Sequence, residues 1–214
     1  MNKDERQGTG FQGDRTMNEK IQLLQRKLHV NDIDFRVGRS GLSKKGAWCT
    51  LLAYKDSRVD MRRLDEVFPM QWKNAYKRDS NGVLQCEISI YSHDLSEWVS
   101  KVSNGTPSQF EGEKGEYSDA FKRAGFMWGI GRELYDLPEI GIMLNDSEFY
   151  VTERKGKEYV NMDYSFKPND WDWTLNWDHI DQHGNKGLIH AKMKGSPSYR
   201  VKPKSIFLKH KIRE

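Results

Sequence analysis

The chain has 214 residues, of which 36% are hydrophobic and 31% charged, and its 35 Lys and Arg against 31 Asp and Glu give a net charge of +4. This length suits one sizeable domain, and so small a net charge permits nucleic-acid binding without requiring it. No apolar run is long enough to span a membrane, the first residues lack a signal-peptide core, and the two cysteines form no CxxC motif. These features exclude a membrane helix, a zinc ribbon and a thioredoxin-type site, and they predict a soluble protein of the reducing cytoplasm.

The N-terminal quarter is predicted to contain an arm, a helix, a loop and a strand. Residues 1–16 are polar and Gly-rich without periodicity, which is typical of a flexible arm. Apolar residues at helical spacing then indicate a helix, capped by Thr16 or Asn18. Turn-forming residues dominate 31–46, which predicts a loop, and the short apolar run 47–54 predicts a buried strand.

The clearest pattern in the chain is an antiparallel meander followed by a helix. A short helix over 62–68 is expected to stop at Pro69. QWKNAYKR and VLQCEISIY each alternate with period two around an Asn-Gly turn, and LSEWVSKV supplies a third strand. After a loop over 103–115, a helix carries an apolar stripe that must pack on the sheet: Tyr117, Phe121, Ala124 and Trp128. The predicted fold class is therefore α+β, with a β-β-β-α core in which the meander packs on the helix.

The rest of the chain is predicted to be β-rich and to end in a basic tail. A hairpin is expected about Lys155-Gly156, and WDWTLNW would place its tryptophans on one strand face. Because large aromatic side chains are usually buried, core positions are expected for Trp171, Trp173 and Trp177, and for Trp72, Tyr76 and Trp98 of the meander. Residues 196–214 carry six Lys and Arg against one acid, which suits contact with nucleic acid or a partner, or a solubilising end.

An adjacent pair of cations, Lys122 and Arg123, lies in the helix opposite the apolar stripe. Gly125 follows, so little side-chain bulk is expected nearby and a phosphate chain could approach the backbone. The alternative is an ordinary solvated face, on which Asp119 pairs with Arg123 at i,i+4.

Four segments in order resemble the Sak-type single-strand annealing proteins of bacteriophages, viral members of the superfamily named for the eukaryotic mediator Rad fifty-two. They are LQRKLHVNDIDFRVG, AYKDSRVDMRRLDEVF with Trp72 after it, the meander, and GEYSDAFKRAGFMWGIGRELYD, and they span about Gln22 to Asp136. The resemblance implies a single-strand annealing domain over 17–195, with a core over 20–136 and a β-rich part over 138–195. It also implies a homo-oligomeric ring, for example undecameric.

The activity that this resemblance implies is binding of single-stranded DNA and annealing of complementary strands in phage homologous recombination and DNA repair. The protein would act in the host cytoplasm without ATP, a metal or another cofactor, and it would not be an enzyme. Candidate partners are a phage exonuclease and a single-strand-binding protein, with no membrane partner.

The resemblance further implies which residues hold the DNA. In the family a basic pair lines a groove for the strand backbone, and here that pair is Lys122 and Arg123. An arginine before the short helix corresponds to Arg58, and a lysine about two turns upstream of the pair corresponds to Lys114. Eukaryotic relatives have a further arginine where this chain has Phe126. Either the groove is less basic here, or Phe126 stacks on a base.

Other motifs give weaker hypotheses. GLSKKGAW lacks the Gly-Lys-Ser/Thr ending of a phosphate loop, although Lys44 and Lys45 could contact DNA as well as water. A GxGxxG match at residues 8–13 has no strand before it, so no dinucleotide site is expected. DHIDQHGNKGLIH suggests the alternative of a metal-dependent nuclease, whose ligands would come from Asp178, His179, His183, Asn185 and His190. The simpler explanation is a hairpin, and a further alternative is an oligomeric scaffold that recruits replication proteins.

Overall fold

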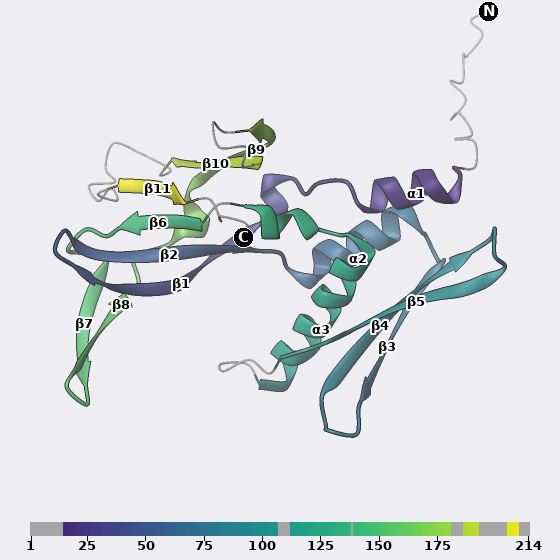
Figure 1. Ribbon diagram of the computed structural model, residues 1–214, viewed down its shortest axis with the longest axis horizontal. Helices are drawn as coiled ribbons and strands as arrows, with labels where there is room; N and C mark the ends of the chain where they lie inside the picture. The colour runs from purple at the N-terminus through teal and green to yellow at the C-terminus, as the bar shows by residue number, and fades with distance from the viewer. Residues whose placement is uncertain (1–14, 107–111, 138, 181–185, 193–204, 210–214) are drawn as a thin grey trace, which may run out of the picture.

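The computed structural model describes residues 15–106, 112–137, 139–180, 186–192 and 205–209. These residues form an α+β structure with antiparallel sheets. Along its long axis, a three-stranded sheet lies at one end, the helices lie in the middle and a larger β-rich part lies at the other end (Figure 1). The α-helices of the described part are α1 (Met17–Leu24), α2 (Ser57–Val67) and α3 (Gly112–Trp128).

The predicted meander and its helix are confirmed. The sheet has the order β3-β4-β5, with β3 at Trp72–Arg78, β4 at Leu84–Ser92 and β5 at Glu97–Asn104. The alternating residues of β4 are buried against α3, whose Trp128 indole donates a hydrogen bond of 3.0 Å to the carbonyl of Ile88. The stripe on α3 packs as expected, since Phe121, Ala124 and Trp128 are buried in this cluster and Tyr117 lies at its edge.

Trp98 does not lie in the core, and that prediction is wrong. In the register of β4 with β5, Trp98 is opposite Tyr91, on the sheet face away from α3, while Val99 is opposite the buried Ile90. Trp98 is 42% exposed, and the ammonium of Lys73 lies 4.2 Å from its ring centroid. Trp72 and Tyr76, which share the face of Ile90 and Cys86, pack against the core as predicted.

The first two helices begin at side-chain caps. Thr16 makes a capping box with Glu19 at the start of α1, as the sequence predicted. Helix α2 begins at Ser57, five residues earlier than predicted, because the Asp56 side chain accepts a hydrogen bond from the Arg58 amide. Arg58 therefore lies in the first turn of α2 and not in a segment before the helix.

The segment 31–46 was predicted to be a loop, and this prediction is wrong. After a 3₁₀ turn at Val30–Asp32, the chain forms strand β1 (Asp34–Ser43), which pairs with the predicted strand β2 (Gly46–Tyr54). The register shifts between Val37 and Ser40, so an irregular strand accommodates the Gly and Ser residues. Pairing with β2 and burial of Phe35 outweigh the weak strand propensity of the segment.

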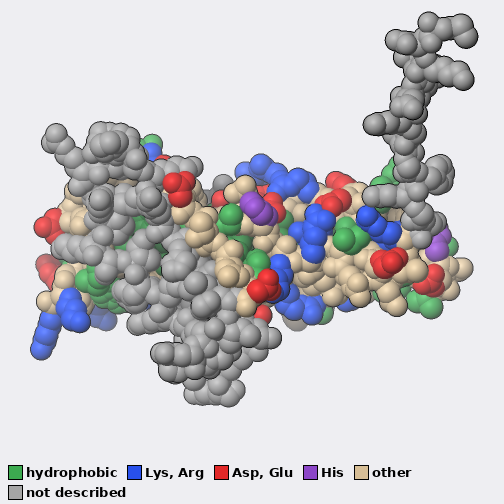
Figure 2. Space-filling model, turned by 90° about the horizontal axis from the view of Figure 1, so that it is seen from above, with side chains coloured by type: hydrophobic (Ala, Val, Ile, Leu, Met, Phe, Trp, Pro, Cys, Tyr) green, Lys and Arg blue, Asp and Glu red, His purple; other side chains and the backbone are tan. Residues whose placement is uncertain are grey.

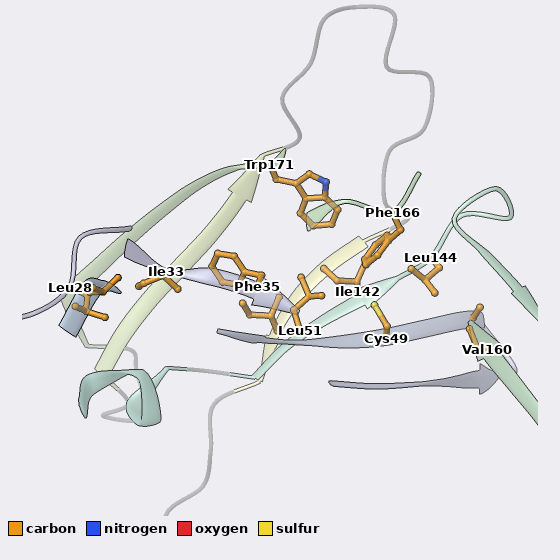
Figure 3. Close-up of a cluster of buried hydrophobic side chains, with 13 residues drawn as sticks. Leu28, Ile33, Phe35, Cys49, Leu51, Ile142, Leu144, Val160, Phe166 and Trp171 are labelled. Atoms are coloured by element: carbon orange, nitrogen blue, oxygen red, sulfur yellow. The ribbon is translucent and has the colours of Figure 1, made fainter. Parts of the chain in front are cut away.

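The β1–β2 hairpin belongs to a four-stranded sheet with the order β1-β2-β6-β11, in which β6 is Glu139–Met143 and β11 is Ser205–Lys209. Figure 3 shows Phe35 and Leu51 of the hairpin with Ile142 of β6 in one hydrophobic cluster. Two further hairpins follow β6 in the chain: β7 (Phe149–Arg154) with β8 (Lys157–Met162), and β9 (Asp172–Ile180) with β10 (Lys186–Lys192).

The tryptophans of β9 and of the turn before it lie in or against this cluster, as predicted. Trp171 is buried, Trp173 stacks on Phe35 with ring centroids 3.7 Å apart, and the Trp177 indole donates to the carbonyl of Leu28 at 2.9 Å. These side chains therefore serve the fold and do not form an open stacking platform.

The predicted N-terminal arm lies almost entirely outside the described residues, as does the basic tail apart from β11. The proposed boundaries of the annealing domain stay predictions. Within the described part of the chain, no helix is long and apolar enough to cross a bilayer.

Candidate nucleic-acid interface

One face of α3 carries a row of polar side chains spaced four residues apart. Lys114, Ser118 and Lys122 follow one another along this face, because residues at i and i+4 are neighbours on a helix surface. Lys114 is exposed and Lys122 is partly buried. The Ser118 hydroxyl donates a hydrogen bond of 3.3 Å to the Ser57 hydroxyl in the first turn of α2. The start of α2 is therefore held against α3 between the two lysines.

This contact brings Arg58 to the same region. Arg58 directly follows Ser57, and its side chain is 81% exposed, with Nε 3.6 Å from the Asp56 carboxylate. Three of the predicted DNA-binding cations, Arg58, Lys114 and Lys122, thus lie around the junction of two helices. Since α2 and α3 are far apart in the sequence, only the fold joins them.

Arg123 lies one residue further around α3 and makes an ion pair with Asp119. The distance from Arg123 Nε to Asp119 Oδ2 is 2.8 Å, and the same carboxylate oxygen accepts a hydrogen bond of 3.0 Å from the Thr106 amide. This is the pair expected of a solvated helix face. Because the arginine is about half exposed, its guanidinium still has donors available for a phosphate.

Behind this row, a buried ion pair lies where α2 packs on α3. The side chains of Lys55 and Asp60 are fully buried and paired, and the Lys55 ammonium also donates to the Ile130 carbonyl at 2.6 Å. Gly125 of α3 packs directly on the pair, so that a Cβ atom at this position would lie 2.0 Å from Asp60 Oδ1. The expectation that Gly125 leaves room for a phosphate chain is therefore wrong, because the space is filled by the Asp60 carboxylate.

Burial shifts the titration of both members of this pair. It raises the pKa of Asp60 to about 6, against the opposing charge and hydrogen bond of Lys55, and it lowers the pKa of Lys55. The positive charge of Lys122 acts on both groups: it opposes the rise in the pKa of Asp60 and adds to the lowering of the pKa of Lys55. Lys122 thus lies within electrostatic range of the buried pair, which fixes the helix junction beneath it.

Phe126, one turn after Lys122, has partners inside the protein. Its ring centroid lies 4.1 Å from the Lys55 ammonium and 5.1 Å from the ring of Tyr135, which is 57% exposed. Stacking of Phe126 on a base stays a prediction. The exposed Tyr135 is the more accessible ring of the two, and the sequence analysis missed it because its position follows no helical spacing from Phe126.

Arg132 is a second residue that the sequence analysis missed. Its guanidinium donates to the carbonyl of Phe126 at 2.9 Å and to that of Met127 at 3.1 Å, which caps the C-terminal end of α3. Arg132 thus brings a positive charge to the turn of α3 that contains Phe126, from the segment that follows the helix. The signal in the sequence was a basic residue directly after the Gly-x-Gly that ends the helix.

Cations and acids are interspersed on one face of the molecule. Figure 2 shows Lys and Arg side chains interspersed with Asp and Glu on the face seen there.

The model of the Rad52/22 family of double-strand break repair proteins matches residues 16–149 of the chain. The chain belongs to the Rad52/22 family. No curated protein and no solved structure gives a significant match. Rad52/22 proteins anneal DNA strands in double-strand break repair and recombination, and they act by binding and not as conventional enzymes.

The Rad52/22 match runs from the capping residue of α1 to the first residue of β7, and it includes every predicted DNA-binding residue. Lys44 and Lys45 are exposed in the turn of the β1–β2 hairpin. This turn lies at the end of the molecule away from α3 (Figure 1). The structure therefore does not bring these two lysines together with Lys122 and Arg123.

The histidine-rich segment outside the Rad52/22 match forms the hairpin that was the simpler explanation. Strands β9 and β10 pair antiparallel, and the residues that connect them, including His183 and Asn185, lie outside the described residues. Of the proposed ligands, only Asp178 has a described side chain, and it is exposed with its carboxylate 3.3 Å from the Lys27 ammonium. Within the described ranges, no cluster of three His, Cys, Asp or Glu side chains could hold a metal.

Proposed function

We propose that this Rad52/22 protein is a Sak-type bacteriophage annealing protein, which binds single-stranded DNA without sequence preference and anneals complementary strands without ATP. The observation that carries the proposal is the Ser118–Ser57 hydrogen bond, because it places the start of α2 between two lysines of α3. Lys122 and Arg123 would hold the strand backbone, with Arg58 and Lys114 beside them. All four residues lie within the part of the chain that matches the family.

The chemistry of annealing asks for such an arrangement. Lysine provides a point charge and arginine a fork of donors, and both bind phosphates whatever the base sequence. The bases then remain free to pair, and duplex formation is itself favourable, so no nucleotide hydrolysis is required. Acids beside the cations, such as Asp56 and Asp119, lower the affinity for the DNA backbone, which allows release of the product duplex.

A homo-oligomeric ring is part of the proposal. Strands β3 and β5 form the two edges of the three-stranded sheet, and each edge offers unpaired backbone groups to a second copy of the chain. Repeated head-to-tail contacts of this kind close into a ring when the rotation between copies allows it. A phage exonuclease and a single-strand-binding protein are the candidate partners.

Annealing is tested with two complementary oligonucleotides, one carrying a fluorophore and the other a quencher, without ATP and in the presence of EDTA. We expect quenching to proceed faster with the protein than without it. Size-exclusion chromatography on the same sample checks for an oligomer. If the protein forms an oligomer but does not bind DNA and leaves the quenching rate unchanged, the proposal is contradicted and a scaffold is favoured. Cleavage of the oligonucleotides that appears only on addition of Mg²⁺ favours a nuclease.

Removal of the negative charge of Asp119 is expected to strengthen DNA binding and not to weaken it. In Asp119→Asn, the guanidinium of Arg123 loses its anionic partner and a negative charge leaves the DNA-binding face. We expect tighter binding of oligo-dT by roughly two- to fivefold at low salt, with the gain disappearing at high salt because the effect is electrostatic. The measurement is fluorescence anisotropy across a salt series. Weaker binding in the variant at every salt concentration would instead show that Asp119 orients Arg123 for DNA.

A further inference from the structure

The β7–β8 hairpin lies almost wholly outside the family match, which ends at its first residue, Phe149. It projects from the body at the opposite end of the molecule from the three-stranded sheet (Figure 1). Its base is anchored, because Val160 is buried and its carbonyl accepts a hydrogen bond of 2.7 Å from the Ser40 hydroxyl of β1. A projecting element with an anchored base can present a fixed surface to a ligand.

The two faces of this hairpin have opposite chemistry. Directly paired residues share a face, so one face combines Tyr150/Asn161, Thr152/Tyr159 and Arg154/Lys157, while the other combines Phe149/Met162, Val151/Val160 and Glu153/Glu158. The second face is the one that packs on the protein core, through Phe149, Val160 and Met162. The first, here called the tyrosine face, therefore points away from the core.

The tyrosine face exposes both aromatic rings and positive charges to solvent. Tyr150 is 54% exposed and Tyr159 is 48% exposed, on diagonal positions of neighbouring strands. Arg154 and Lys157 are exposed at the tip, where Lys157 is next to Tyr159 along β8 and Arg154 is diagonal to Tyr159 across the strands. Within the described part of the chain, none of these four side chains makes an ion pair or a ring contact. Two glutamates stand directly opposite each other on the other face at Glu153/Glu158, so the tip is divided by charge.

The turn at the tip adds a third cation at a conformational cost. Lys155 has φ 52° and Gly156 has φ 70°, the left-handed values of a type I′ turn. Asn, Asp or Gly suits the first of these positions better, because the side chain of lysine gains nothing that offsets the crowding of its Cβ. The tip thus concentrates Arg154, Lys155 and Lys157, even though the backbone at Lys155 favours Asn, Asp or Gly.

We propose that the tyrosine face of the β7–β8 hairpin is a second contact for single-stranded DNA, separate from the row on α3. Tyrosine rings stack on any base, and cations beside them bind the phosphates that link successive bases. The acidic opposite face repels the same strand, which fixes the side on which it binds. This inference rests on the proposed function, and it assigns to this chain a contact beyond the family domain.

The test compares four variants by fluorescence anisotropy with labelled oligo-dT in EDTA, over a salt series. In Tyr150→Ala/Tyr159→Ala we expect binding at least about fivefold weaker, because stacking on each base is lost. In Arg154→Ala/Lys157→Ala we expect the slope of log affinity against log salt to fall by roughly 1.4, at about 0.7 for each phosphate contact with a single strand. Tyr150→Phe/Tyr159→Phe retains the rings and should bind like the wild type.

The fourth variant, Glu153→Gln/Glu158→Gln, is the matched control on the opposite face, and we expect it to bind as tightly as the wild type or more tightly. Circular dichroism and thermal unfolding check that all four variants fold. One outcome overturns this inference alone: the wild type binds DNA, mutation of Lys122 and Arg123 abolishes that binding, and both alanine variants of the hairpin bind like the wild type. Absence of binding by the wild type overturns it together with the proposed function. Equal weakening in the Glu153/Glu158 control also overturns it, since the effect would then not belong to the tyrosine face.

Discussion

Lys122→Ala/Arg123→Ala is expected to abolish binding of single-stranded DNA at physiological salt while leaving the size of the oligomer unchanged. Each side chain would lose a charge-assisted contact to a phosphate, worth roughly 1.5–3 kcal/mol, so together they should cost more than about 100-fold in affinity. The dependence of affinity on salt should also weaken, by roughly 0.7 in slope for each phosphate contact removed. Anisotropy gives the affinity, and multi-angle light scattering gives the size of the oligomer.

The fold should tolerate this change, which makes the result interpretable. Arg123 is about half exposed and its pair with Asp119 is a surface pair, which contributes a few tenths of a kcal/mol to stability. A matched control removes two neighbouring cations elsewhere, in Arg26→Ala/Lys27→Ala, where both side chains are about half exposed and are paired with Glu66 and Asp178 outside α3. If the control loses binding as strongly as the Lys122/Arg123 variant, the DNA responds only to net charge and the assignment of the α3 row is wrong.

The parts of the fold that could be predicted from sequence are those in which the hydrophobic residues follow a single period, either two for a strand or 3.6 for a helix. In β4, Cys86 and Ile88 alternate with polar residues, and period two leaves one arrangement that buries them on α3. On α3 itself, Phe121 and Trp128 lie on one helical stripe, so the packing of helix on sheet followed from their spacing. Where hydrophobic period and turn chemistry agree, local sequence determines the element.

The parts that sequence did not predict depend on partners distant in the chain. Strand β1 contains Gly and Ser that favour turns, and it becomes a strand because β2 supplies its hydrogen bonds. The Asp56 cap was present as a local signal, yet it was missed because the hydrophobic run of α2 starts later. The role of Gly125 could not be read at all, since a glycine in a helix looks the same whether it leaves space for a ligand or admits a buried carboxylate.

The candidate site shows the same division. The resemblance to a family named Lys122, Arg123, Arg58 and Lys114, and the structure adds that the two helices carrying them are in contact through Ser57 and Ser118. It offers no such contact for Lys44 and Lys45, whose hairpin turn points elsewhere. The ion pair beneath the row was invisible in the sequence, because a loop lysine and a helical aspartate five residues apart form no periodic pattern.

This buried pair carries the second large prediction. In Lys55→Met, Asp60 is left as an uncompensated carboxylate with a fully buried side chain, and one of its oxygens, Oδ2, already has no hydrogen-bond partner among the described residues. We expect the free energy of unfolding to fall by roughly 3–5 kcal/mol at pH 8. The double variant Lys55→Met/Asp60→Leu should recover most of that loss, because an apolar pair of similar volume needs no compensation for buried charge. Urea denaturation of the wild type, the single variant and the double variant measures both effects.

The single variant should regain stability as the pH falls, and this separates loss of charge compensation from loss of packing. Burial already raises the pKa of Asp60 to about 6, and Lys55 opposes that rise, so removal of the lysine raises the pKa of Asp60 further. A carboxyl group whose pKa is higher in the folded state than in the unfolded state binds its proton more tightly when folded. Its contribution to stability is therefore complete below the unfolded pKa and is lost as pH rises through the folded pKa. We expect the deficit of Lys55→Met relative to the double variant to shrink between pH 8 and pH 5, whereas a deficit that is equal at both pH values would mean that the lysine stem and not its charge supports the junction of α2 with α3.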